Sequence, residues 1–189
     1  MSKSLHSLLA CAVLAFVFSS PKAWADPGYE LEINKTAKTL LVKIGQKVER
    51  AFKVALGTGG TGEKATAGDG RTPTGTYRIV KLNEGSKFSL FMQLNYPNLK
   101  DAYYGLKHGL ISQREFNAIL DALDRGEIPP QNTGLGGVIG IHGLAETTDN
   151  TLAIHRNFNW TKGCIALTSS EIRDLRQYVA LGTRVVIRD

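Results

Sequence analysis

Cysteine is scarce in this 189-residue sequence, which contains only Cys11 and Cys164. Cys11 lies in an apolar run near the start, "LLACAVLAFVF", and the small-x-small sequence "AWA" follows at residues 23–25. A basic start, an apolar run and such a tripeptide are typical of a secretory signal peptide, here residues 1–25. The mature chain therefore keeps one cysteine and cannot form an internal disulfide.

Long apolar runs are also missing. The signal's own core is too short to cross a bilayer, and no other stretch is longer, so we expect no stable membrane anchor. Lipidation at Cys11 would leave almost no apolar segment ahead of it, which argues against a lipoprotein. Residues 26–189 suffice for a single domain with its own core. We expect an exported protein of the periplasm or cell envelope.

Neither sign of charge dominates the chain. Without Lys3 and Lys22 of the signal, 21 basic residues face 17 acidic ones, a net charge of +4. This mild excess suits an acidic polymer such as a cell wall, and a solvated surface explains it equally well. No basic cluster is interleaved with aromatic residues, which argues against a nucleic-acid partner.

The remaining sequence predicts a mostly β domain, because apolar and polar residues alternate in short segments. Capping boxes at Ser112/Glu115 and Thr168/Glu171 each predict the start of a helix. We expect strands at 29–34, 39–44, 48–56, 75–82, 91–98, 136–143 and 183–189, a helical insertion at about 99–128, and one helix after Cys164.

A glycine-rich stretch, "LGTGGTGEKATAGDGRTPTG" at residues 56–75, satisfies G-x-G-x-x-G and nearly matches a phosphate-binding loop. Both nucleotide-binding motifs need a helix directly after the glycines, because its N-terminus holds the phosphate. Here Pro73 and Gly75 predict a loop between two strands instead. We therefore expect no nucleotide partner.

The lone Cys164 sits in "WTKGCIAL", ahead of a predicted helix. A thiol is nucleophilic as a thiolate, so it needs a base or a cation nearby, and His142 at the end of "GVIGIHG" is the candidate base. Gly163 lets the backbone bend and leaves room for a carbonyl, while nearby amide groups would face a developing oxyanion. Lys162 would lower the pKa of the thiol or bind a carboxylate. This set suits acyl transfer.

Two other uses of the same residues are open. Cys164 would be an inert core residue if it were simply buried. A zinc site would combine His142, His155 and Cys164, but the chain shows no paired ligand spacing such as C-x-x-C. We expect no metal and no cofactor.

The sequence resembles the L,D-transpeptidase catalytic domain family (YkuD-type). The resemblance rests on "IGIHG" followed by "WTKGCIAL", on "GDGRTPTGTYRI" and on the closing "LGTRVVI", and covers about residues 29–188. It implies a mixed β-sandwich-like fold. It also implies an exported cysteine acyltransferase of bacterial peptidoglycan that attacks a stem tetrapeptide between the L-centre of a diamino acid and a D-alanine.

The resemblance assigns roles residue by residue. Cys164 maps to the nucleophile, His142 to the base, Gly143 to the carbonyl that orients the base, and Thr161 to the hydroxyl of the motif. Gly163 supports the backbone bend directly before the nucleophile. Candidates for substrate contact are Arg71, Arg156 and Trp160, since a guanidinium binds carboxylates and an indole forms a cleft wall.

This chain departs from the common S-H-G-C motif, because Lys162 stands in place of the histidine, and Ala166 where arginine or asparagine is frequent. The change marks a sub-branch of the family. Water in place of an acceptor amine would make a hydrolase or amidase that trims stem peptides or releases wall-linked protein. A non-catalytic wall-binding module is the alternative from another class.

Overall fold

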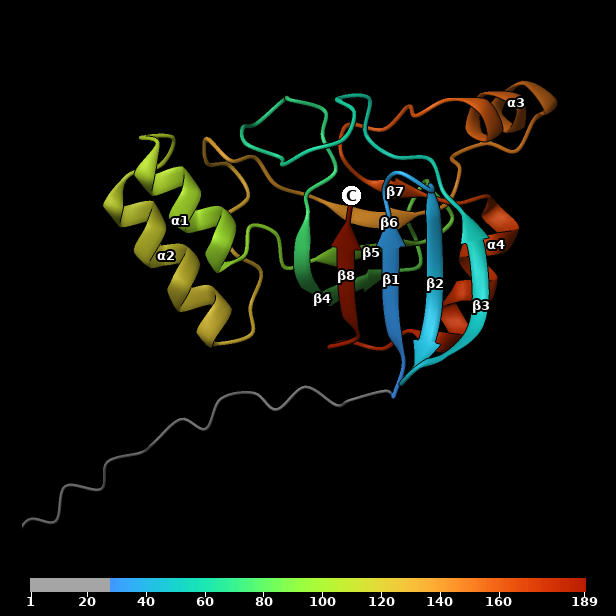
Figure 1. Ribbon diagram of the computed structural model, residues 1–189, viewed down its shortest axis with the longest axis horizontal. Coiled ribbons are helices and arrows are strands. Elements are labelled where there is room, and N and C mark those ends of the chain that lie inside the picture. Colours follow the sequence, from blue (N-terminus) through green and yellow to red (C-terminus); the bar gives the residue numbers. More distant parts are fainter. Residues whose placement is uncertain (1–27) are drawn as a thin grey trace, which may run out of the picture.

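The computed structural model describes residues 28–189, so the predicted signal peptide lies outside the described residues (Figure 1). One mixed eight-stranded sheet has the strand order β3-β2-β1-β8-β4-β5-β6-β7. The strands are Glu30–Asn34 (β1), Thr39–Ile44 (β2), Lys47–Lys53 (β3), Gly75–Asn83 (β4), Phe91–Leu94 (β5), Gly140–His142 (β6), Ile165–Ala166 (β7) and Arg184–Arg188 (β8). The mostly β fold predicted from the sequence is confirmed.

The first three strands form an antiparallel meander because their apolar residues alternate with polar ones. Leu31 and Ile33 of β1 and Leu40 and Val42 of β2 are completely buried. The closing strand β8 pairs parallel to β1, with Val185 opposite Leu31. The chain therefore brings its last strand into the middle of the sheet.

The sheet curls until its two ends meet. β3 and β7 are the edge strands in the order of pairing, and Ala55, two residues beyond β3, bridges Ala166 of β7. A single core fills the curl with side chains from both halves, among them Ile33, Ile141 and Ile165. The strands that carry His142 and Cys164 are thereby fixed against the opposite edge.

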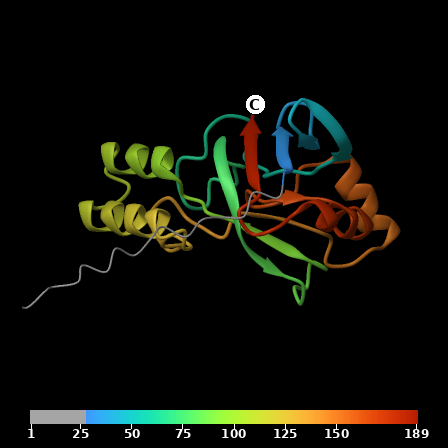
Figure 2. The ribbon, with the colours of Figure 1, turned by 90° about the horizontal axis from the view of Figure 1, so that it is seen from below.

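The helical insertion consists of α1 (Leu99–Lys107) and α2 (Gln113–Asp124), each begun by a capping box. It stands to one side of the sheet in both ribbon views (Figures 1 and 2). The helical insertion, together with Leu135 that follows it, has a small core of its own, which consists of Ala102, Ile111, Ile119 and Leu135.

Several elements differ from their predicted bounds: the expected strand at 91–98 is paired only over Phe91–Leu94, and the one at 48–56 ends at Lys53. The expected strand at 136–143 is paired only over Gly140–His142. A helix that we did not predict, α3 (Asp149–Asn157), lies between His142 and Cys164; its sequence, DNTLAIHRN, shows little apolar periodicity. The helix after Cys164 is α4 (Ser169–Leu175), followed by a 3-10 turn over Arg176–Tyr178. Among the described residues, no helix has the length and apolarity needed to span a membrane.

Candidate active site

His142 ends strand β6, and Cys164 directly precedes strand β7, which pairs with β6. These strands run parallel with Ile141 opposite Ile165, and both isoleucines are completely buried in the core. Because successive side chains alternate between faces, the residue after Ile141 and the residue before Ile165 both point away from that core. Alternation thus directs the side chains of Cys164 and His142 to the same side of this strand pair.

The backbone corner ahead of Cys164 is built from Thr161 and Gly163. Gly163 has a φ of +119°, a conformation that favours glycine, and a Cβ there would lie 2.6 Å from the Arg71 carbonyl oxygen. The buried Thr161 hydroxyl donates to the Cys164 carbonyl at 2.7 Å and accepts from the Gly163 amide at 3.2 Å. The Cys164 amide has no acceptor among residues 28–189. It remains available to a ligand.

The Cys164 thiol is half-buried and donates to the backbone carbonyl of Val138 at 3.5 Å. Burial raises the pKa of this thiol; hydrogen bonding from Gly140 and the charge of Lys64 lower it in part. Gly140 stands opposite the cysteine, and a Cβ there would lie 2.6 Å from the Phe91 ring. A side chain at position 140 would therefore clash with β5.

His142 is buried in an aromatic surround, with ring centroids at 4.5 Å from Phe88, 6.1 Å from Phe91 and 5.7 Å from Trp160. Its Nδ1 lies 2.7 Å from the Gly143 carbonyl oxygen. A carbonyl only accepts, so Nδ1 carries the proton and, in the neutral ring, Nε2 keeps its lone pair. Burial lowers the pKa of His142, which favours this neutral, basic form.

An apolar pocket of about 270 Å³ adjoins the imidazole. Phe88 and Trp160, which both contact the His142 ring, line it together with Leu144 and residues of α3. The unpredicted helix α3 therefore forms one wall of the candidate site. Its position follows from tertiary packing and not from a local sequence signal.

The glycine-rich stretch 56–75 packs directly against the Gly163 corner. Gly57 pairs with Thr161, and a Cβ on Gly57 would lie 3.0 Å from the Gly163 Cα. No helix follows the glycines, since the next described element is β4, as predicted. A loop that we interpreted as a connection between strands is thus part of the site's wall.

Lys64, in this loop, is a residue that the sequence analysis missed. It is buried, with its ammonium 2.7 Å from an Asp69 carboxylate oxygen and 2.9 Å from the Thr66 carbonyl oxygen. Asp69 also accepts hydrogen bonds from the amides of the loop. Burial raises the pKa of Asp69, but the hydrogen bonds from Lys64 and from those amides outweigh it, so the pKa is lowered overall. Of the lysines, Lys64 and not Lys162 lowers the pKa of the Cys164 thiol.

Val138 and Gln131 form a second feature that sequence patterns did not indicate. Val138 has a φ of +54°, which is strained for a β-branched residue. Its amide donates to the Gln131 side-chain oxygen at 2.6 Å, and the Gln131 amide group donates to the carbonyls of Tyr96 and Pro129. This network at the exit of the helical insertion fixes the backbone whose carbonyl contacts the Cys164 thiol.

The predicted substrate-contact residues lie in different surroundings. The Arg71 guanidinium donates to the Gly59 and Glu63 carbonyls within the glycine-rich loop. Arg156 is exposed on α3, and Lys162 points outward without a partner in the described range. Trp160 stands between two imidazoles, contacting His142 and donating to His155 Nδ1 at 3.4 Å.

No group of three or more His, Cys, Asp or Glu residues that could bind a metal ion occurs within residues 28–189. The alternative zinc set of His142, His155 and Cys164 therefore does not assemble as a ligand cluster. His155 is instead buried on α3, where it contacts Trp160.

A family model for the L,D-transpeptidase catalytic domain, YkuD, matches residues 28–187. A search of curated proteins found no match. Among solved structures, the helical cell shape determining protein Pgp2 from Campylobacter jejuni is 23% identical with a TM-score of 0.55, covering 85% of this chain and 47% of its own. Bd1075 from Bdellovibrio bacteriovorus is 21% identical with a TM-score of 0.53, covering 89% of this chain and 50% of its own.

The chain thus spans about half the length of these two solved structures. At such identities the likeness establishes the fold alone. The family match covers nearly all of the described residues, including both strands of the candidate site.

Proposed function

The chain belongs to the L,D-transpeptidase catalytic domain family, and we propose that it is an exported cysteine acyltransferase acting on peptidoglycan stem peptides. The observation that supports the proposal is the parallel pairing of β6, which ends at His142, with β7, which directly follows Cys164. The Gly143 carbonyl holds Nδ1 of that histidine, which directs the basic Nε2 away from the backbone.

In the first step, the Cys164 sulfur attacks the carbonyl carbon between the diamino acid's L-centre and D-alanine. His142 Nε2 accepts the thiol proton as the sulfur–carbon bond forms. The Cys164 amide N–H stabilises the negative charge that develops on the carbonyl oxygen. The imidazolium then gives its proton to the leaving nitrogen, D-alanine departs, and a thioester remains on Cys164.

In the second step, an acceptor amine attacks the thioester and His142 takes the proton from its nitrogen. The sulfur leaves, is reprotonated, and the donor is joined to the acceptor through a new amide bond. Thr161 and Gly163 hold the corner through both steps, because their hydrogen bonds fix the carbonyl and amide next to the sulfur. Lys162 stays at the protein surface beside this corner.

Intact-mass spectrometry tests the acylation step directly. Incubation with a stem tetrapeptide is expected to add the mass of the donor minus D-alanine to the wild-type chain. Cys164→Ala should show no adduct, and His142→Gln should form it at least about a hundredfold more slowly, as expected for a lost general base. An adduct of equal size on Cys164→Ala would refute the proposal.

Product analysis with and without an acceptor amine distinguishes the alternatives. A transpeptidase gives the joined peptide when the amine is present, whereas a hydrolase or amidase gives the free tripeptide in both cases. A wall-binding module without catalysis would bind the tetrapeptide, release no D-alanine and form no thioester. The first outcome supports cell-wall cross-linking or remodelling as the role of this enzyme.

A further inference from the structure

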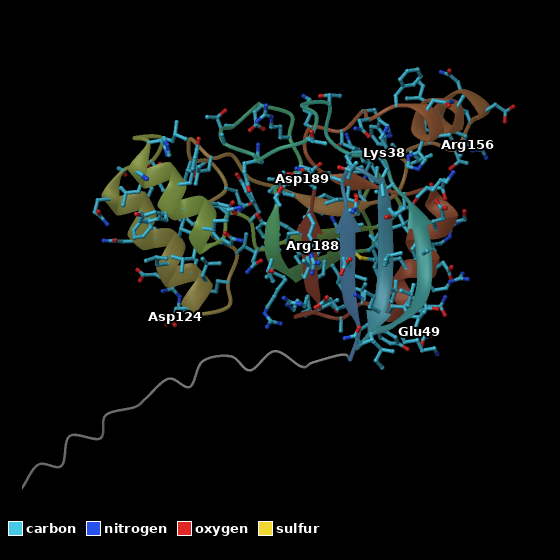
Figure 3. The ribbon with its side chains drawn as sticks, viewed as in Figure 1. Lys38, Glu49, Asp124, Arg156, Arg188 and Asp189 are labelled. Carbon is cyan, nitrogen blue, oxygen red and sulfur yellow. The ribbon has the colours of Figure 1, made fainter. Side chains whose placement is uncertain are left out.

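A basic groove lies on the α3 side of the candidate site. It has a volume of about 1180 Å³ and runs between the β1–β2 turn, the end of β3, α3 and the start of α4. Its cationic lining residues are Lys38, Lys53, Arg156 and Arg173. Figure 3 shows Lys38 and Arg156 at the same end of the molecule, although they are far apart in the sequence.

The four cations of the basic groove outnumber the one carboxylate in its lining. None of their side chains forms an ion pair or a hydrogen bond within the described part of the chain, whereas most other arginines and lysines near the sheet are paired. The single acidic residue in the lining is Glu171, and its carboxylate already accepts from the Thr168 amide and hydroxyl at 3.0 and 2.6 Å. The groove therefore presents a positive field to a ligand.

The basic groove is connected to the candidate site by two aromatic side chains. His155 lines the groove and accepts from the Trp160 indole, and Trp160 contacts the His142 ring. The groove and the candidate site therefore meet at the contact between His155 and Trp160. The volume exceeds that of a site for a single small anion, so it suits an extended segment.

We propose that the basic groove binds a peptide strand bearing several carboxylates, the acidic stem of the wall polymer, next to the reacting centre. Arginine and lysine bind carboxylates through charge-assisted hydrogen bonds, and Ser169 and Ser170 add hydroxyl groups to the same lining. The identity of the polymer rests on the proposed function, whereas the preference for a carboxylate-rich peptide rests on the groove alone. A groove enclosed by two helices and strand ends fits a chain better than a flat membrane surface.

A pair of double charge reversals tests the groove. Lys53→Glu with Arg173→Glu changes the groove, and Lys107→Glu with Arg114→Glu changes two exposed, unpaired cations on α1 and α2 by the same total charge. The probe is a synthetic stem tetrapeptide with free carboxylates, compared with the same peptide amidated at each carboxylate. Calorimetry gives Kd at low salt, and circular dichroism verifies that both variants are folded.

The groove variant should bind the free-acid peptide about tenfold more weakly, because two exposed cations no longer attract its carboxylates, and the matched control should change less than about twofold. The amidated peptide should bind the wild-type chain as weakly as it binds the groove variant. Equal Kd values for the two double variants, or unimpaired binding of the amidated peptide, would overturn the inference. So would a groove effect seen with anionic phospholipid vesicles and not with the peptide.

The same experiment separates this inference from the proposed function. If the wild-type chain forms no thioester while the groove variant alone loses peptide affinity, the acyltransferase fails and the groove stands. If thioester formation proceeds and both variants keep the wild-type Kd and KM, the groove fails and the acyltransferase stands.

Discussion

Burial governs the protonation states of Cys164 and His142, the two groups of the candidate site. Burial raises the pKa of the Cys164 thiol above its ordinary value of 9.0 and lowers that of His142 below 6.5. Near neutral pH both groups are therefore uncharged, a thiol and an imidazole, and not a thiolate and an imidazolium. In the proposed mechanism, the thiol loses its proton during attack, when His142 accepts it.

This predicts the pH dependence of thiol reactivity. The alkylation rate of Cys164 with iodoacetamide should rise steadily up to pH 9, because the thiolate fraction is governed by a raised pKa. Acylation by a stem peptide should persist below pH 6.5, because the lowered pKa of His142 keeps the base form at that pH. Rapid alkylation at pH 6 in the wild-type chain, absent in His142→Gln, would instead reveal a preformed ion pair.

Lys64 provides a second test of the sulfur's surroundings. Lys64→Met should raise the pKa of the Cys164 thiol further and slow alkylation at a fixed pH, since the Lys64 charge lowers that pKa. It should also destabilise the fold by about 3 kcal/mol, because Asp69 loses its buried partner. Lys64→Arg, which keeps the charge, is the control, and alkylation profiles measured well below both melting temperatures check the effect. An unchanged profile in Lys64→Met would show that its charge does not reach the sulfur.

Residue types alone make Cys164 and His142 candidates, because a lone cysteine after a glycine and a histidine at a strand end match a nucleophile and its base. Lys64 and Gln131 carry no such signal. A lysine in a glycine-rich loop is ordinarily exposed, and only the packing of that loop against Tyr96 and the Gly163 corner buries it. Such roles arise from long-range contacts, which a local pattern does not encode.

Among the elements, the helical insertion does more than extend the surface. Its exit segment supplies Gln131, which holds Val138 in its left-handed backbone conformation, and the Val138 carbonyl contacts the thiol. A non-glycine residue in that conformation costs about 1–3 kcal/mol, so it persists only where neighbours enforce it. We infer that Gln131 is a positioning residue for Cys164.

Gln131→Leu should therefore lower kcat at least about tenfold, through a displaced sulfur, and leave KM nearly unchanged. Combining it with Val138→Gly should restore part of kcat, because glycine adopts the positive φ without enforcement. The exposed neighbour provides the control, Asn132→Leu. A loss that the double variant fails to recover, with an equal loss of melting temperature, would point to a purely structural role.

Helices and strands were predicted correctly where capping residues or an alternating pattern are strong. The prediction failed where contacts with distant segments determine the local structure. The capping boxes at Ser112 and Thr168 predict α2 and α4, which the structure confirms. The expected strand at 136–143 is shortened to β6 because the backbone before it bonds to other partners. The Val138 amide donates to the Gln131 side chain, and the Gly134 carbonyl accepts from Ala67 of the glycine-rich loop, so neither pairs with a neighbouring strand. Helix α3 escapes prediction because its amphipathic face is weak and its cap is a Thr148–Thr151 pair rather than a threonine–glutamate one.

At the scale of the whole molecule, closure of the curled sheet explains one departure from the family motif. Ala166 is completely buried, pairs with His142 on one side and bridges Ala55 on the other. The resemblance described above implies arginine or asparagine at this position. In this chain the two edges of the sheet meet at Ala166, and a long side chain has no free space.

Ala166→Arg should therefore destabilise the domain by about 3 kcal/mol or more, because it forces a charge without a partner into the contact between β7 and the end of β3. For a domain of this size that corresponds to a melting temperature lower by about 10 °C, measurable by calorimetry. Ala51→Arg on β3 is the matched control, since Ala51 is exposed, and it should shift melting by less than about 2 °C. Suppose instead that Ala166→Arg melts at the same temperature as the control and is acylated faster. The two edges of the sheet would then have room for an arginine, and closure of the sheet would not explain the alanine.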